Sequence, residues 1–143
     1  MEISTCVKYV GVNDHQVDLF EGQYKVPNGM SYNSYVILDE KIAVMDTVDG
    51  FFTEEWLNNV EQVLSGKTPD YLVIQHMEPD HSASIPAFLK KYPNATVVST
   101  AKGFQFMEQF FPEFFAGQGL PAEQRIVAAN DGVLELGQHS LHF

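Results

Sequence analysis

One short segment, Tyr71–Ile74, constrains the fold of this chain more than any other. Its residues form a continuous apolar run, which is typical of a β-strand that is buried on both faces. A second run of the same kind follows at 96–99. Segments with helical periodicity lie before, between and after these two runs. Strands that alternate with helices in this way predict an α/β fold with a mixed β-sheet.

The remaining elements follow from local patterns. We expect further strands at 34–38, 42–46, 125–129, 133–136 and 140–143, short strands within 7–20, and a loop at 22–29. We expect helices at 53–64, 84–92 and 103–111. The first helix is the clearest, because its apolar residues recur at helical spacing: Trp56, Leu57, Val60, Val63 and Leu64. Thr53 is placed to cap that helix, Pro86 suits the first turn of the second, and Pro112 ends the third.

Composition restricts the class of protein and its partners. A chain of 143 residues with 45% hydrophobic residues is the size of one domain and can bury a core. Its net charge of −11, without any run of Lys or Arg, disfavours nucleic acid and anionic membranes as partners. No apolar segment approaches the roughly 20 residues that span a bilayer, and Met1–Thr5 lacks the start of a signal peptide. With Cys6 as the single cysteine, we expect a cytoplasmic protein without disulfides.

The loop after the first buried strand concentrates the candidate metal ligands. Positions 76–81 read HMEPDH, which is the pattern H-x-E-x-D-H. Side chains alternate along an extended segment, so His76 and Glu78 can face one ion, while Asp80 and His81 can face a second. Imidazole and carboxylate ligands together suit iron, manganese or zinc. Loop residues of these types also cap helices, but four ligand types at this spacing favour a metal site.

These residues carry a resemblance to a known family. The pattern H-x-E-x-D-H is similar to that of the flavodiiron proteins, also called A-type flavoproteins, and the similarity continues at 82–86, 10–14, 31–35 and 42–48. Ala83 departs from the Gly of that family. Glu78 stands where most hydrolases of the same superfamily carry His, and an anionic ligand there favours redox iron over zinc hydrolysis. The resemblance implies a metallo-β-lactamase-like αββα sandwich, with a mixed sheet and helices packed outside.

The resemblance also implies a function and a domain organisation. It implies a diiron site that reduces dioxygen or nitric oxide, with electrons from FMN in a flavodoxin-like domain and a redox partner such as rubredoxin. His76 and Glu78 would hold one iron, Asp80 and His81 the other, and Asp46 would be a supporting carboxylate that orients the ligands. Residues 1–143 would be the N-terminal part of the metallo-β-lactamase-like domain. Its C-terminal part, with further ligands, and the flavodoxin-like domain would be absent.

We therefore expect this chain to be inactive on its own, with no catalytic residue and no FMN-binding residue. Two other interpretations stay open. The chain could be a non-catalytic module with the same fold, or a zinc-dependent hydrolase, which Glu78 disfavours. Half of a sandwich would leave an apolar sheet face exposed, so we also expect a homodimer in which a second copy covers that face.

Other residues that suggest chemistry are expected to be structural. We expect His15 in a surface loop and His139 and His142 as exposed strand residues. Cys6 is expected to be a small buried apolar residue, because the sequence offers it no evident base. The six phenylalanines between 104 and 115 are expected to be mostly core, with some at an interface.

Overall fold

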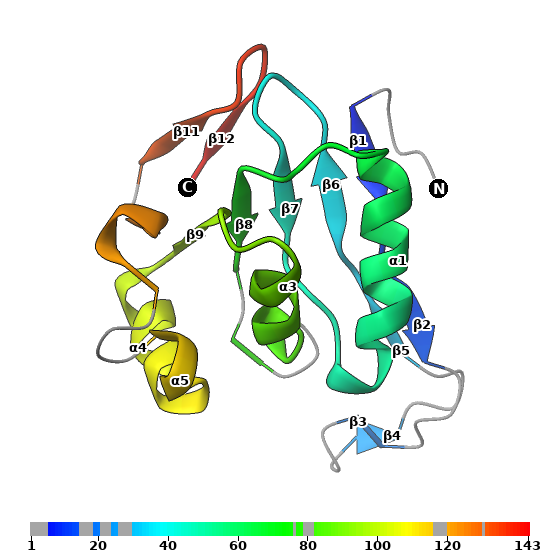
Figure 1. Cartoon of the computed structure of the whole chain (residues 1–143). Coiled ribbons are helices and arrows are strands. Elements are labelled where there is room, and N and C mark those ends of the chain that lie inside the picture. The colour runs from blue at the N-terminus through cyan, green and yellow to red at the C-terminus, as the bar shows by residue number, and fades with distance from the viewer. Residues whose placement is uncertain are drawn as a thin grey trace.

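The computed structural model describes residues 6–14, 19–20, 24–25, 30–75, 77–78, 82–115, 120–129 and 131–143. Its largest feature in these ranges is a six-stranded sheet with the order β1-β6-β7-β8-β9-β10 (Figure 1). The strands are β1 (Val7–Tyr9), β6 (Tyr35–Ile37), β7 (Ala43–Met45), β8 (Tyr71–Val73), β9 (Thr96–Ser99) and β10 (Arg125–Val127). Antiparallel pairing joins β1, β6 and β7, whereas β7 to β10 are parallel neighbours. The predicted mixed sheet is confirmed.

Helices cover one face of this sheet. They are α1 (Thr53–Leu64), α3 (Ile85–Lys91), α4 (Ala101–Phe110) and α5 (Pro112–Phe115), with the 3₁₀ turns η1 (Gly50–Phe52) and η2 (Ala122–Gln124). In register across β7, β8 and β9, the side chains of Val44, Leu72 and Val97 enter one buried cluster. They pack there against helix residues such as Trp56 and Phe88. Burial of an apolar side chain of this size contributes roughly 1.5–3 kcal/mol, so this layer is the main source of stability.

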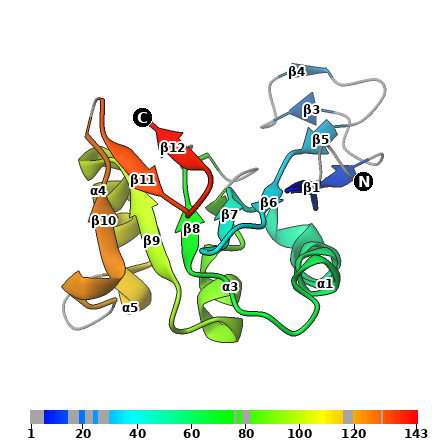
Figure 2. The same cartoon turned by 90° about the horizontal axis from the view of Figure 1, so that it is seen from above.

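A hairpin covers the centre of the opposite face, as Figure 2 shows. Its strands are β11 (Val133–Glu135) and β12 (Ser140–His142). Leu134 and Leu136 pack on the sheet residues that alternate with the first set, namely Ala43, Val73 and Val98. The expectation that this face lies open is therefore wrong at its centre, because the chain folds its own hairpin over it. The homodimer stays a prediction, and it now depends on the apolar side chains left exposed on the hairpin side of the sheet: Ile126 on β10, in register with Val98, Val133 on β11 and Phe143 after β12.

Two further strand pairs lie outside the main sheet. They are β2 (Val12–Asp14) with β5 (Met30–Tyr32), and β3 (Leu19–Phe20) with β4 (Tyr24–Lys25). The short early strands are thus confirmed, but β4 falls inside the segment 22–29 that we expected to be a loop. Among the described residues, no helix has the length and apolar character needed to cross a membrane.

The helix boundaries agree with the sequence except at two starts. Thr53 does not cap α1 but is its first residue, and Asp49 instead caps the preceding turn η1 by accepting a hydrogen bond from the backbone N of Phe51 at 3.0 Å. Helix α4 begins at Ala101, earlier than expected, because the hydroxyl of Thr100 accepts a hydrogen bond from the backbone N of Gly103 at 3.0 Å. Side-chain oxygens of this kind satisfy the first free N–H groups of a helix.

Candidate metal centre

The loop with the candidate ligands leaves the sheet at the end of its central strand β8. Of the four predicted ligands, the structure describes Glu78, whose side chain is exposed. His76, Asp80 and His81 lie outside the described residues. In the part of the chain that is described, no three His, Cys, Asp or Glu side chains are grouped so that they could hold a metal ion. The four-ligand metal site therefore stays a prediction, and the described residues show how the loop is held.

Asp46 holds the chain directly before this loop. Its Oδ1 accepts a hydrogen bond from the backbone N of Gln75 at 2.7 Å, and its Oδ2 accepts one from Gln75 Nε2 at 3.2 Å. We call these two bonds the Asp46 tether. Asp46 is 5% exposed and has a φ of 60°, a left-handed conformation that Asp adopts more readily than most residues. The tether fixes Gln75, which precedes His76, and the role of Asp46 as a supporting carboxylate stays a prediction.

Buried hydrogen bonds connect Asp46 to the helix layer. The indole Nε1 of Trp56 donates to Ser34 Oγ at 2.9 Å, and that hydroxyl donates to the backbone carbonyl of Asp46, also at 2.9 Å. Trp56 and Ser34 are fully buried. A buried polar group without a partner costs about 1–3 kcal/mol, so these bonds strongly favour one placement of Asp46. Neither Ser34 nor Gln75 is singled out by the sequence, although Gln75 adjoins the motif.

Two serines hold the other end of the loop. The hydroxyl of Ser82 lies 3.0 Å from the carbonyl oxygen of Met77 and 2.9 Å from that of Glu78. The hydroxyl of Ser84 donates to the carbonyl of Val48 at 2.9 Å, which connects the start of α3 to the segment after β7. Both serines are buried. The described parts of the loop are therefore held by Asp46 at Gln75 and by serines at residues 82 and 84.

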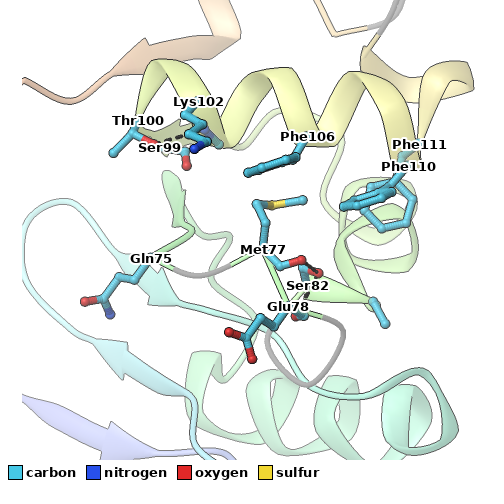
Figure 3. Close-up of a pocket in the computed structure, with 12 residues that line it drawn as sticks. Gln75, Met77, Glu78, Ser82, Ser99, Thr100, Lys102, Phe106, Phe110 and Phe111 are labelled. Atoms are coloured by element: carbon cyan, nitrogen blue, oxygen red, sulfur yellow. Dashed lines mark hydrogen bonds between the residues drawn. The ribbon is translucent and has the colours of Figure 1, made fainter. Parts of the chain in front are cut away.

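A cavity of about 680 Å³ opens between this loop and helix α4 (Figure 3). It is lined by Gln75, Met77, Glu78, Ser82, Ala83, Ser99, Thr100, Lys102, Gly103, Phe106, Phe110 and Phe111. The side chain of Met77 points toward Phe106, and the carboxylate of Glu78 lies on the side away from α4. Cavities of this volume accommodate small molecules. The lining combines an aromatic wall with a carboxylate and an ammonium group, so it offers an apolar space beside Glu78.

The aromatic cluster of the sequence is divided between core and cavity. Phe104 and Phe115 are buried in the core, which is fewer of the described side chains than we expected. Phe106, Phe110 and Phe111 line the cavity instead, and Phe110 is 58% exposed. The helical spacing alone could not separate the two sets, because both occur on α4 and its continuation.

Comparison with curated proteins finds relatives whose names agree with one another. A scan against protein-family models finds no match. The anaerobic nitric oxide reductase flavorubredoxin of Vibrio vulnificus is 36% identical over 101 residues, which is 70% of this chain and 20% of that protein. Diflavin flavoprotein A 1 of Synechocystis sp. is 33% identical over 131 residues, which is 91% of this chain and 22% of that protein.

Solved structures agree with these relatives. The flavodiiron protein from Giardia intestinalis matches with a TM-score of 0.85 and 30% identity, over 99% of this chain and 32% of that chain. The rubredoxin oxygen:oxidoreductase of the anaerobe Desulfovibrio gigas matches with a TM-score of 0.88 and 30% identity, over 98% of this chain and 33% of that chain.

The chain belongs to the flavodiiron protein family. Its fold is that of the family's metallo-β-lactamase-like domain, as the resemblance implies. The chain spans about a fifth of the length of the curated flavodiiron relatives and about a third of the solved flavodiiron chains. It corresponds to an N-terminal fragment of these larger proteins.

Proposed function

We propose that this chain supplies the first half of the diiron site of a flavodiiron oxygen or nitric oxide reductase. The observation that carries the proposal is the Asp46 tether, because a buried carboxylate holds the backbone directly before His76. Carboxylates that orient metal ligands from behind are a regular part of metal sites. The family relationship supports the same conclusion, since the Vibrio vulnificus relative is a nitric oxide reductase and the Desulfovibrio gigas relative an oxygen oxidoreductase.

The donor set fits iron as far as the structure describes it. Glu78 presents an exposed carboxylate at the rim of the cavity, and the motif adds two imidazoles and a second carboxylate. His76 and Glu78 would hold one iron, and Asp80 and His81 the other. Bound iron would supply one-electron chemistry at this loop. The residues described would seat the loop and keep an apolar space beside it.

On its own the chain is inactive in this proposal, because its four candidate ligands provide only two for each iron. Metal binding is coupled to folding and gains affinity with each ligand, so two ligands would hold an iron weakly. The electrons would come from FMN in a flavodoxin-like domain, and a rubredoxin-type partner would deliver them to that FMN. This chain would not bind the FMN. Turnover of dioxygen or nitric oxide by the isolated chain would contradict this part of the proposal.

Metal analysis of protein purified without air tests the site itself. We expect iron by mass spectrometry, reduced several-fold by Glu78→Gln and unchanged by Glu55→Gln, which alters another exposed glutamate, on α1. Zinc in place of iron would favour the hydrolase. Protein that takes up no metal, even with added iron(II), would overturn the proposal and leave the non-catalytic module.

A further inference from the structure

Three titratable side chains from distant parts of the chain meet on the opposite edge of the molecule from the metal loop. Cys6 precedes β1, Asp39 lies in the turn between β6 and β7, and His139 lies in the turn between β11 and β12. The tips of these two turns lie side by side (Figure 1), where the backbone N of Lys41 donates to the carbonyl of Leu136 at 2.8 Å. The carbonyl of Cys6 in turn accepts from the backbone of this same turn region, at Leu38.

Asp39 fixes the imidazole of His139. Asp39 Oδ2 lies 2.8 Å from His139 Nδ1 and accepts the backbone N–H of His139 at 2.7 Å. Its Oδ1 accepts the backbone N–H groups of Glu40 at 2.8 Å and Gln138 at 3.1 Å. The carboxylate side chain is 5% exposed. Desolvation raises the pKa of Asp39, but the hydrogen bonds from Gln138, Glu40 and His139 outweigh it and hold that pKa well below its ordinary range.

The consequence is a defined tautomer at His139. An ionised carboxylate only accepts hydrogen bonds, so Nδ1 carries a proton and the neutral ring presents a lone pair at Nε2. That nitrogen lies 3.4 Å from Cys6 Sγ, within hydrogen-bonding distance for sulfur. A nucleophile in contact with a base, which is itself oriented by a third group, is the general arrangement of activated nucleophiles.

We propose that Cys6 is a nucleophilic thiol, activated by the Asp39–His139 pair, that exchanges with small disulfides. The sequence offers Cys6 no evident base, but in the structure His139, from the far end of the chain, contacts its sulfur. Cys6 is half-buried rather than enclosed, and the side chain of His139 is 49% exposed, so a small reagent can reach the sulfur. Thiolates beside an imidazolium are reactive in this way.

The exchange step is balanced within these groups and the disulfide. His139 Nε2 takes the thiol proton, and the Cys6 thiolate attacks one sulfur of the disulfide. A new S–S bond forms to Cys6 while the old one breaks, and the departing sulfur leaves as a thiolate that takes up the proton from His139. Cys6 is oxidised to a mixed disulfide, and one half of the reagent is reduced.

Other titratable side chains stand on the same elements and belong to the electrostatic surroundings. They are Lys8 on β1, Glu40 and Lys41 in the β6–β7 turn, and Glu135 and His142 on the hairpin. His142 provides a matched control, because it lies on the same hairpin and its Nε2 contacts Ser140 Oγ at 3.3 Å rather than the sulfur.

The test is the rate of reaction with 4,4′-dithiodipyridine as a function of pH. Cys6 is the single cysteine, so the signal has one source. Near pH 7 only a few per cent of an ordinary thiol is ionised to thiolate. An activated thiol has a larger thiolate fraction, but each thiolate is less nucleophilic, so the rate rises less than the fraction does. We therefore expect the folded chain to react about tenfold faster there than the same chain unfolded in urea. His139→Gln should abolish that advantage, Asp39→Asn should reduce it, and His142→Gln should leave it unchanged.

The wild-type profile decides the outcome even if a variant misfolds. A thiolate absorbance that appears on folding, with a rate that stays high below neutral pH, supports the proposal. A folded chain whose rate follows that of the unfolded chain across the pH range would overturn it. Equal losses in His139→Gln and His142→Gln would overturn it as well.

Discussion

Replacing Asp46 tests whether one buried carboxylate seats the loop. Hydrogen bonds to a charged group contribute about 1.5–3 kcal/mol and neutral ones about 0.5–1.5 kcal/mol. Asp46→Asn keeps a neutral acceptor for Gln75 and tolerates the φ of 60°, so we expect a loss of about 1–1.5 kcal/mol. Asp46→Ala removes the acceptors and adds a left-handed backbone penalty of about 1 kcal/mol, for a total of about 3–4 kcal/mol. Asp46→Gly should recover about 1 kcal/mol of that, because glycine adopts positive φ freely.

Urea unfolding followed by tryptophan fluorescence gives these differences in the free energy of unfolding. Amide hydrogen exchange at Gln75 provides a local measurement, because its N–H donates to Asp46 Oδ1 at 2.7 Å. We expect exchange there to accelerate more in Asp46→Ala than in Asp46→Asn. If the alanine and asparagine variants are equally stable and exchange at Gln75 is unchanged in both, the tether does not hold the loop.

Three further outcomes follow from other parts of the fold. Gly103→Ala should lower the free energy of unfolding in urea by about 1–3 kcal/mol, because the new Cβ would lie 2.2 Å from the buried Ser99 Oγ. Gly50→Ala is the control and should be near neutral, because its Cβ meets nothing closer than 3.8 Å. Burial raises the pKa of Asp39, but hydrogen bonding outweighs it and lowers that pKa in the folded state. The stabilisation by the Asp39 carboxylate is therefore present above its unfolded pKa of about 3.9 and is lost as pH falls through the folded pKa. The melting temperature of Asp39→Asn should accordingly fall less than that of the wild type between about pH 5 and pH 2. Light scattering should give a dimer mass, twice 16.1 kDa, that Ile126→Glu weakens, because Ile126 lies in register with Val98 on the hairpin side of the sheet; a monomer at all concentrations would refute the homodimer.

Features encoded over short distances were predictable from the sequence. Helix α1 has the expected bounds, Thr53–Leu64, because one turn after another repeats the same apolar spacing. The strand Tyr71–Val73 has the expected burial in the middle of the sheet. Six consecutive residues, 76–81, indicate the family, which is confirmed, while the metal site they predict stays a prediction.

Features that depend on topology were not predictable. Gln75 is held by Asp46, 29 positions away, and Cys6 contacts His139, 133 positions away. No local pattern specifies which strand ends become neighbours, and such polar contacts follow only after the sheet order is set. The packing of Leu134 on the sheet has the same origin, since alternation in a strand shows that one face is buried but not against what.

The hydrogen bonds from Trp56 through Ser34 to Asp46 also make the chain its own optical probe. Trp56 is the single tryptophan, it is fully buried, and its indole N–H donates to the hydroxyl that holds the Asp46 carbonyl. Indole emission responds to the polarity around the ring, so a change that releases Ser34 or displaces Asp46 shifts the spectrum without an attached dye. The Cys6 region lies on the other edge of the molecule, so reagents at the thiol and events at the loop can be followed in the same sample as separate signals.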